Sequence, residues 1–392
     1  MMLRNFLFPV YEESGSDGRR IRSMLIMLSM VSFMSHQMWR SVFNNFAVEV
    51  AGINAAQMGI IQSVREVPGF LALLVIFVII FIQEQYLAFL SLALMGLGIL
   101  LTGFFPDFGG LIFTVLMMSV GFHYFETVNQ SLTLQHIPKS ELPRFMGQVR
   151  SYGSLGDVFG FLAVLILLLF LPYKYIYLIA GLLVIAAVAY GFWQYPLFMP
   201  KVVQRKKMVL RKRYWLYYLL TFLSGARRQI FTAFAVFLMV QKFAFSVKTI
   251  TILFLINSII NMFWAPLIGR MLDYFGERVV ISIEYTGLIF VFAGYAFTQS
   301  VLMVAALYIF DHLFFNMSIA IRTYFQKIAD PADIAPTMAV GFTINHIAAV
   351  LIPVTGGLIW MIDYRYTFLM GALLALASLI SAQFVKTAEF SE

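Results

Sequence analysis

Three polar side chains share one face of an apolar segment near residues 110–134. His123, Glu126 and Gln130 follow one another at spacings of three and four residues, so a helix would present all three on the same side. A carboxylic acid and an imidazole on one face can share a proton and change their affinity for it as water enters or leaves. The pattern favours a proton-exchanging site. A buried ion pair with Arg40 or Arg65 is the alternative that the same residues allow.

Arginines at repeated positions form a second candidate site. The segments FMSHQMWRSVFNNFAVEV and FLSGARRQIFTAFAVFLM share a Phe and a Ser before their polar step and Phe-Ala-Val after it, which places Arg40 and Arg228 at nearly equivalent positions. Two arginines from two halves of the chain can clamp an anion through bidentate hydrogen bonds. Arg227 precedes Arg228, and only one of the two can face a cavity well. The residues leave open a second interpretation, in which buried acids neutralise the arginines and the pairs only hold helices together.

Further polar side chains lie at similar depth, near the middle of apolar segments. If those segments cross a membrane, this is the depth at which membrane carriers bind their substrates. Asp311 and His312 repeat the pairing of acid and imidazole, and Asp157 is a third acid. The expected solute-binding side chains are Gln37, Arg40, His123, Arg227, Arg228, Asn257, Asn316 and Asn345. The expected proton-coupling residues are His123, Glu126, Asp157, Asp311 and His312.

The composition requires lipid around these residues. The chain has 392 residues, of which 61% are apolar and 12% are charged, whereas soluble domains have about 25% charged residues. The sequence therefore predicts a polytopic membrane protein. The absence of cysteine removes disulfides, thiolate metal sites and cysteine nucleophiles. The net charge of +8 is explained by topology rather than by nucleic acid, because membrane proteins gather Lys and Arg on the cytoplasmic side.

Apolar stretches of about 20 residues, long enough to cross a bilayer, recur along the whole chain and predict twelve transmembrane helices. A cytoplasmic leader at residues 1–21 precedes a six-helix bundle at 22–198, and a basic linker at 199–213 leads to a second bundle at 214–388. Most of the 27 Lys and Arg residues fall in the leader, the linker and the loops on the same side. Both termini are therefore expected in the cytoplasm, and the protein is expected in the inner or plasma membrane.

A loop motif identifies a family. GRMLDYFGERV, at residues 269–279, resembles the Gly-x-x-x-Asp-x-x-Gly-x-Arg signature of the major facilitator superfamily, with Gly269, Asp273, Gly276 and Arg278 in the matching positions. RFMG and the glycine-rich GSLGDVFG resemble the family's fifth span. A tight turn is expected to explain the glycines. The corresponding loop after the second span, FIQEQYLAF, lacks the signature, and the family's frequent arginine in the fourth span is absent.

The resemblance implies an all-α membrane protein in which two pseudo-symmetric six-helix halves alternate access to a central site. The four loop residues and Arg150 are then expected to act at a gate, although Arg150 could also reach the membrane surface with its long side chain.

The leading hypothesis is a secondary active transporter for a small anionic or amphipathic solute, with protons or another ion as the coupling partner. The alternatives are an efflux carrier for multidrug or lipid-like substrates and, from another class, an intramembrane enzyme or a non-transporting sensor. No His-Glu-x-x-His, Gly-x-Ser-x-Gly or nucleotide-binding loop is present, so no enzyme activity is expected. We expect a monomer in the bilayer, with no cofactor, no metal and no nucleic acid.

Overall fold

The computed structural model describes residues 16–75, 78, 81–137, 142–198, 210–329 and 333–386. All regular elements in these residues are helices, which confirms the predicted all-α fold class. The longer helices are α2 (Ser16–Asn45), α3 (Ala55–Phe70), α5 (Glu84–Thr102), α6 (Phe108–His136), α7 (Leu142–Leu167), α8 (Tyr173–Gln194), α9 (Trp215–Ile230), α11 (Val247–Phe297), α12 (Val301–Phe315), α14 (Ile334–Trp360) and α15 (Tyr364–Ala382). Short helical segments extend them: η1 (Phe46–Val50), η2 (Leu71–Leu74), η3 (Lys212–Tyr214), η4 (Phe231–Ala235), α10 (Val236–Gln241), η5 (Asn316–Ser318) and α13 (Ile319–Ile328).

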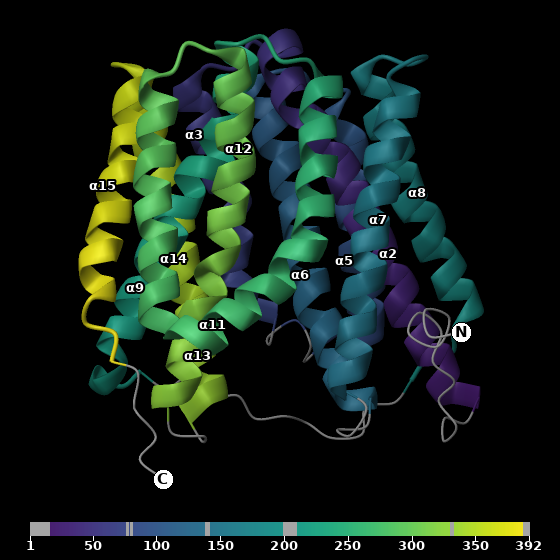
Figure 1. The fold of residues 1–392 in the computed structure, drawn as a ribbon. Helices are drawn as coiled ribbons and strands as arrows, with labels where there is room; N and C mark the ends of the chain where they lie inside the picture. The colour runs from purple at the N-terminus through teal and green to yellow at the C-terminus, as the bar shows by residue number, and fades with distance from the viewer. Residues whose placement is uncertain are drawn as a thin grey trace. The chain divides into compact units, whose positions relative to one another are not determined.

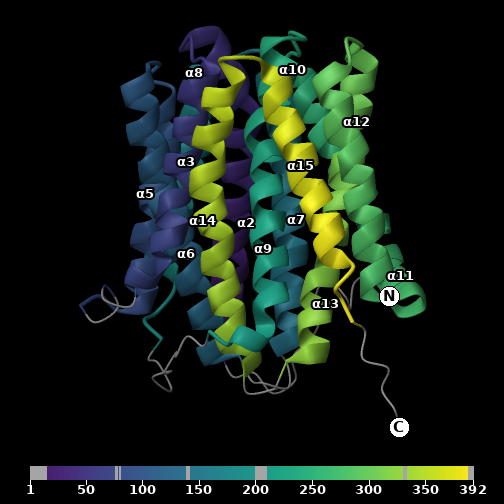
Figure 2. The same cartoon turned by 90° about the vertical axis from the view of Figure 1, so that its left-hand side faces the viewer.

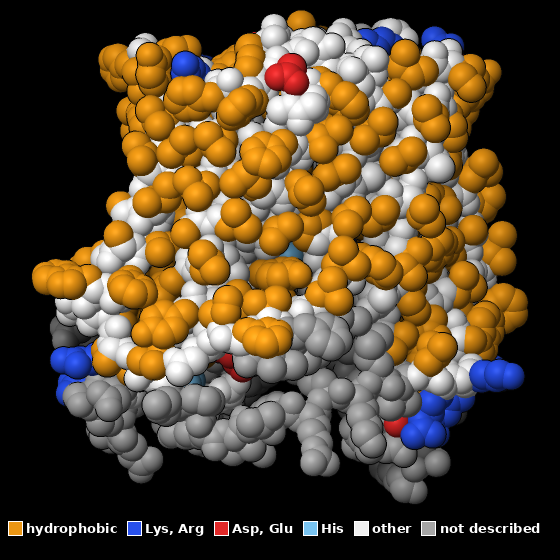
Figure 3. All heavy atoms as spheres, turned by 180° about the vertical axis from the view of Figure 1, so that it is seen from behind, with side chains coloured by type: hydrophobic (Ala, Val, Ile, Leu, Met, Phe, Trp, Pro, Cys, Tyr) orange, Lys and Arg blue, Asp and Glu red, His pale blue; other side chains and the backbone are white. Residues whose placement is uncertain are grey.

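The helices have the length and composition of membrane spans. Within the described residues, nine helical segments are long and apolar enough to cross a bilayer, and Val247–Asn261 is a shorter apolar helix. Each of the twelve predicted spans overlaps a helix, and the eighth (residues 248–269) and the ninth (residues 279–299) both overlap α11. The twelve-helix count is consistent with this arrangement. Hydrophobic side chains cover much of the described face in Figure 3, whereas Lys and Arg lie near its upper and lower margins.

Short polar residues fix where several helices begin. Asp107, Ser246 and Ser300 accept a hydrogen bond from the backbone amide three residues later, and so satisfy a donor that the helix itself cannot pair. Asp363 does the same for the amide of Arg365. These caps allow α6, α11, α12 and α15 to start abruptly after short connections.

The contacts within the chain divide it into two compact units. Unit 1 comprises Met1–Phe43 and Leu71–Gln204, and unit 2 comprises Asn44–Phe70 and Arg205–Glu392. Helices α5 to α8 belong to unit 1, and α3, α9 and α11 to α15 belong to unit 2 (Figure 1). The predicted limits of the two six-helix bundles stay predictions.

Glycine contacts bring the helices of unit 1 close together. A methyl group on Gly156 of α7 would lie 2.5 Å from the carbonyl oxygen of Met30, and one on Gly160 would lie 2.7 Å from that of Met34. Neither distance is possible for a real side chain, so these glycines of the GSLGDVFG segment let α7 pack directly on the backbone of α2. The side chains between them, including Asp157, are positioned by this contact.

In unit 2, α14 packs against both α3 and α9, and α15 packs against α11 and α9 (Figure 2). Gly357 of α14 meets the backbone of α3, because a methyl group there would lie 2.6 Å from the carbonyl oxygen of Ala55. Gly225 of α9 meets Asn345 of α14 in the same way, at 2.6 Å from the amide nitrogen Nδ2. These close approaches bring the polar residues of α3, α9 and α14 within reach of one another.

Candidate solute-binding and coupling sites

Unit 1 contains a cavity of about 270 Å³ between α2, α6 and α7. Its polar lining includes Ser29, Ser32, Glu126, Asn129, Gln130 and Arg150, and its aromatic lining is Phe33, Phe122 and Phe125. Two of the three residues of the predicted face on α6, Glu126 and Gln130, therefore line one cavity, whereas His123 is not among its lining residues. The His123 ring packs edge-on against Phe122, with ring centroids 5.3 Å apart.

The charges around this cavity are balanced. The positive charge of Arg150 acts on both Glu126 and Asp157, and the charge of Arg40 also acts on Asp157. The Arg150 guanidinium lies over the Phe33 ring, 5.7 Å from its centroid. With two arginines and two carboxylates, this group fits the interpretation in which the arginines are neutralised within the protein. Arg150 lines the cavity as well as acting on these acids, and its predicted gate role stays a prediction.

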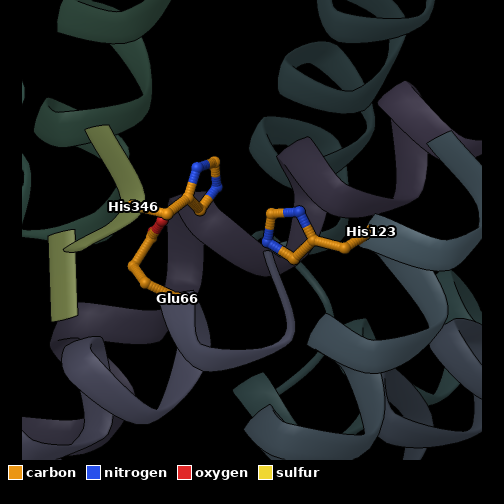
Figure 4. A group of neighbouring side chains, drawn as sticks. All are labelled: Glu66, His123 and His346. Atoms are coloured by element: carbon orange, nitrogen blue, oxygen red, sulfur yellow. The ribbon is translucent and has the colours of Figure 1, made fainter. Parts of the chain in front are cut away.

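Unit 2 brings a different set of charges together. Arg65 and Glu66 of α3 form an ion pair, with Nη2 2.8 Å from Oε1. Arg228 of α9 donates from Nη2 to Oδ1 of Asn345 in α14, at 2.9 Å. A carboxylate oxygen of Glu66 lies within 4.8 Å of an imidazole nitrogen of His346. Figure 4 shows how Glu66 and His346 approach each other from α3 and α14; it also labels His123, which belongs to unit 1.

The adjacent arginines of α9 have separate surroundings. Whereas Arg228 contacts Asn345, Arg227 is 2% exposed and donates from Nη2 to Oε1 of Glu284 in α11, at 3.0 Å. Its guanidinium also lies over the Tyr285 ring, 4.4 Å from the centroid. Asp311 of α12 is equally buried, and the charges of Arg227 and Glu284 both act on it. We call Arg227, Glu284 and Asp311 the buried triad.

Polar atoms of the buried triad have unused hydrogen-bonding capacity. Within the described residues, Oε2 of Glu284, Oδ2 of Asp311 and two nitrogens of Arg227 are buried without a hydrogen-bond partner. The hydroxyl group of Tyr295, a residue on which the charge of Asp311 acts, is in the same condition. Buried polar groups in proteins are nearly always hydrogen-bonded, so this site has the chemistry to hold a small polar species such as a proton or water.

Three other predicted residues of unit 2 lie close to these helices. Asn257 is 3% exposed, and its Nδ2 atom is buried without a partner in the described part of the chain. Asn316 donates to Oδ1 of Asn261 at 2.6 Å and to the carbonyl oxygen of His312 at 2.8 Å, which indicates a helix-stabilising role. The His312 ring packs against Phe231 and Tyr308. Its neighbour Asp311 has a different environment, because the charges of Arg227 and Glu284 act on its carboxyl group.

In unit 1, the predicted residue Gln37 is 8% exposed. Its Nε2 atom has no hydrogen-bond partner among the described residues.

The loop signature is described in part. Gly276 has φ 73° and ψ 170°, a conformation open essentially only to glycine, and it separates the two arms of α11. Gly269 lies within the helix with open space around it, so the expected tight turn explains Gly276 but not Gly269. Arg278 donates to Oε1 of Gln383, at 3.1 Å from Nη2. The side chain of Asp273 lies outside the described residues, and the predicted gate function stays a prediction.

Arg65, Glu66, Glu284 and His346 were not among the site residues expected from the sequence. All four are ionisable residues inside apolar segments, which is the signal that marks functional positions in membrane proteins. Glu66 and His346 lie close together although they are far apart in the sequence, and Glu284 pairs with Arg227 of another helix. These contacts could not be read from spacing along one helix.

The comparisons with known proteins identify the family. The family model of the Major Facilitator Superfamily matches residues 25–353 and 217–389. The chain belongs to this family, as its loop signature predicted, and it is a transporter of a small solute rather than an enzyme. It is a multi-pass integral membrane protein. No curated protein matches the sequence.

Three solved structures of similar fold have low sequence identity to this chain. The nucleoside transporter NupG has a TM-score of 0.77 at 16% identity, with 93% of this chain and 99% of that chain covered. A bacterial homologue of the human lysosomal transporter Spinster has a TM-score of 0.73 at 12% identity, with 95% and 97% covered. A bacterial homologue of the iron transporter ferroportin has a TM-score of 0.71 at 12% identity, with 93% and 98% covered. These likenesses establish the fold alone.

Proposed function

We propose that this chain is a secondary active transporter that recognises an anionic group of its solute through Arg228. The observation that carries the proposal is the hydrogen bond from Arg228 to Asn345. An amide oxygen accepts the hydrogen bond but, unlike a carboxylate, does not neutralise the charge of the guanidinium. In a membrane interior an arginine without a neutralising partner is costly, so such residues line solute or ion pathways.

The surrounding charges support the same conclusion. The side chains whose charges act on Arg228 are Glu66, Arg65 and Arg322, which is one carboxylate against two further arginines. Glu66 is already ion-paired with Arg65. Among the described side chains, the group therefore has an excess of positive charge, which an anionic solute would complement. The balanced charges around the cavity of unit 1 give no such preference.

The buried triad supports proton coupling. If Glu284 and Asp311 were both ionised, the single guanidinium of Arg227 would leave one negative charge in a fully buried site. An uncompensated charge in such a site is unfavourable by several kcal/mol, and one bound proton removes it. Asp311 was predicted as a coupling residue, and Glu284 is its partner in this proposal. Solute transport and proton transfer would then use neighbouring but distinct residues of unit 2.

The solute proposal is tested by uptake into proteoliposomes. Small carboxylates and phosphates are first screened for uptake. For an anionic solute that is taken up, other anions and neutral analogues of matched size are then compared as competitors. An arginine that contacts the anion contributes a charge-assisted interaction of about 1.5–3 kcal/mol, so Arg228→Gln should weaken binding by about ten- to a hundredfold. The control is Arg270→Gln, which removes an exposed arginine from the first arm of α11. Equal affinity of the wild type and Arg228→Gln would contradict the proposal.

A second candidate solute class follows from the cavity of unit 1. Its three phenylalanine rings offer surfaces for stacking a planar ring, and the amides of Asn129 and Gln130 offer both donors and acceptors. Such a lining suits an uncharged, hydroxylated compound such as a nucleoside, the substrate class named for NupG. Inclusion of nucleosides in the same uptake screen separates the two classes, because a nucleoside solute should be insensitive to Arg228→Gln.

A further inference from the structure

A second cavity, a groove on unit 2, does not include Arg228, Asn345 or the buried triad, although Arg278 of the loop signature lines it. It has a volume of about 460 Å³ and is formed by the second arm of α11, by Phe314 at the end of α12, and by Gln383 just after α15. The arm belongs to a predicted membrane span, Tyr274–Phe297. The groove is therefore at the depth of the lipid hydrocarbon rather than in water.

The wall of the groove is apolar along one face of α11. Val279, Ile283 and Phe290 line it at spacings of four and seven residues, which places them on one side of a helix. All three side chains are exposed, Phe290 by 70%. Gly287 provides the depth, because a methyl group at that position would collide with the Phe314 ring. The result is an open channel suited to a flexible hydrocarbon chain.

One end of the groove is polar and positively charged. Arg278 donates to Oε1 of Gln383, and Gln383 in turn donates from Nε2 to Oγ of Ser282 at 3.2 Å. These contacts hold the guanidinium beside the groove opening. Because Gln383 is neutral, the contacts of Arg278 with the described side chains leave its charge available to an anion, and Ser282 and Gln383 add hydrogen-bonding groups. Positive-inside orientation predicts that this end faces the cytoplasmic leaflet, where anionic lipids gather.

The length of the groove matches one lipid leaflet. Arg278 and Phe290 are separated by about 18 Å along the helix, given a rise of about 1.5 Å per residue. Half of a typical hydrocarbon core is about 15 Å. A head group at Arg278 therefore leaves an acyl chain long enough to reach Phe290.

We propose that this groove binds a phospholipid with a net negative head group, its phosphate at Arg278 and one acyl chain along Val279, Ile283 and Phe290. Charge complementarity selects this occupant over a zwitterionic lipid, which would gain the same apolar contacts without the net attraction. A basic residue near an anionic membrane surface contributes about a fivefold preference. The site is separate from solute recognition by Arg228, so neither proposal depends on the other.

The test uses the full-length protein in nanodiscs with spin-labelled phosphatidylglycerol and phosphatidylcholine, whose relative association constants are measured by electron paramagnetic resonance. We expect the wild type to prefer phosphatidylglycerol about fivefold and Arg278→Gln to show nearly equal binding of both lipids. Arg270→Gln is the matched control, because it removes one positive charge from the first arm of α11, outside the groove; it should keep the preference.

A second variant tests the apolar part of the site. Thr286→Trp places a large ring in the groove and should reduce the motionally restricted signal of both lipids. Equal preference in the wild type and Arg278→Gln would overturn the head-group assignment. An unchanged signal in Thr286→Trp would overturn the acyl-chain assignment. Mass photometry of the same samples covers the other occupant: a dimer that becomes monomeric in Thr286→Trp would show that a second copy of the chain, rather than lipid, fills the groove.

Discussion

Arg227 and Glu284 are joined by a hydrogen-bonded ion pair of 3.0 Å in which the two side chains are 2% and 0% exposed. The pair links α9 to α11 inside unit 2, and the Tyr285 ring covers the guanidinium. Such a pair contributes little net stability compared with apolar residues of the same size, but removal of one partner leaves an isolated charge in a site that water does not reach. This asymmetry makes the role of the pair measurable.

Arg227→Gln should destabilise the protein strongly, by about 3–5 kcal/mol, because Glu284 and Asp311 lose their common positive partner. Glu284→Gln should also destabilise it, and the double variant Arg227→Gln with Glu284→Gln should be more stable than Arg227→Gln alone. Thermal unfolding in detergent measures the three effects. If the destabilisation of the double variant equals the sum of the two single-variant effects, Arg227 and Glu284 do not stabilise each other despite their distance of 3.0 Å.

Asp311→Asn should separate proton coupling from solute binding. Asparagine has nearly the same size but cannot ionise, so the triad would become neutral without taking up a proton. Uptake driven by an imposed proton gradient should fall to the level without a gradient, while exchange of solute across equal concentrations continues. Asp157→Asn in unit 1 is the comparison, and it should keep the stimulation by the gradient. If Asp311→Asn responds to the gradient like the wild type, the triad does not bind the coupled proton.

Asp333 lies outside the membrane spans and provides a stability test by pH. Burial alone would raise the pKa of its carboxyl group, but hydrogen bonds from Arg211, Tyr214 and Arg213 outweigh this effect and hold the pKa below its usual value. A depressed carboxyl pKa contributes stability above the unfolded-state pKa of about 3.9, and this contribution is lost as the pH falls through the folded-state pKa. The wild type should thus be more stable than Asp333→Asn at neutral pH, with the difference shrinking below about pH 4. A difference that stays constant from pH 7 to pH 3 in thermal unfolding would contradict this assignment.

The two glycines of the loop signature should respond in opposite ways to alanine. Gly276→Ala forces a side chain into a glycine-only backbone conformation, which costs about 1–3 kcal/mol. Gly269→Ala places a methyl group in open space on a helix, where alanine is more favourable than glycine by up to about 1 kcal/mol. Thermal unfolding of the two variants compares the same substitution seven residues apart. Equal destabilisation would show that the positive φ of Gly276 is not the reason for its presence.

Much of the fold could be predicted from composition and hydropathy, because the bilayer imposes one length and one polarity on every span. The glycine contacts could not, since nothing in the local sequence says which backbone Gly156 or Gly225 will meet. The loop motif was sufficient to predict the family. Its glycines look alike in the sequence, yet only Gly276 has the unusual backbone conformation.

The candidate sites could be predicted only to the level of residue types. Depth along each span selected Arg227, Arg228 and Asn345 as candidates, and their roles stay predictions. The two adjacent arginines have separate partners. The partners themselves depend on helix packing. Glu284 is 57 residues from Arg227, and no periodicity within a helix can connect them.

The ion pair between Arg227 and Glu284 also sets a condition on biosynthesis. The chain emerges from the ribosome at about 5–20 residues per second, so the 57 residues between the two partners take roughly 3 to 11 s to make. During that interval α9 must enter the membrane with an arginine that still lacks its acid, at a cost of about 2.5–3.5 kcal/mol for a charge at the centre of a helix. Stable insertion of α9 therefore depends on the synthesis of α11. In a nascent chain that stops before Glu284, α9 would be less stably inserted and the chain would be a target for degradation.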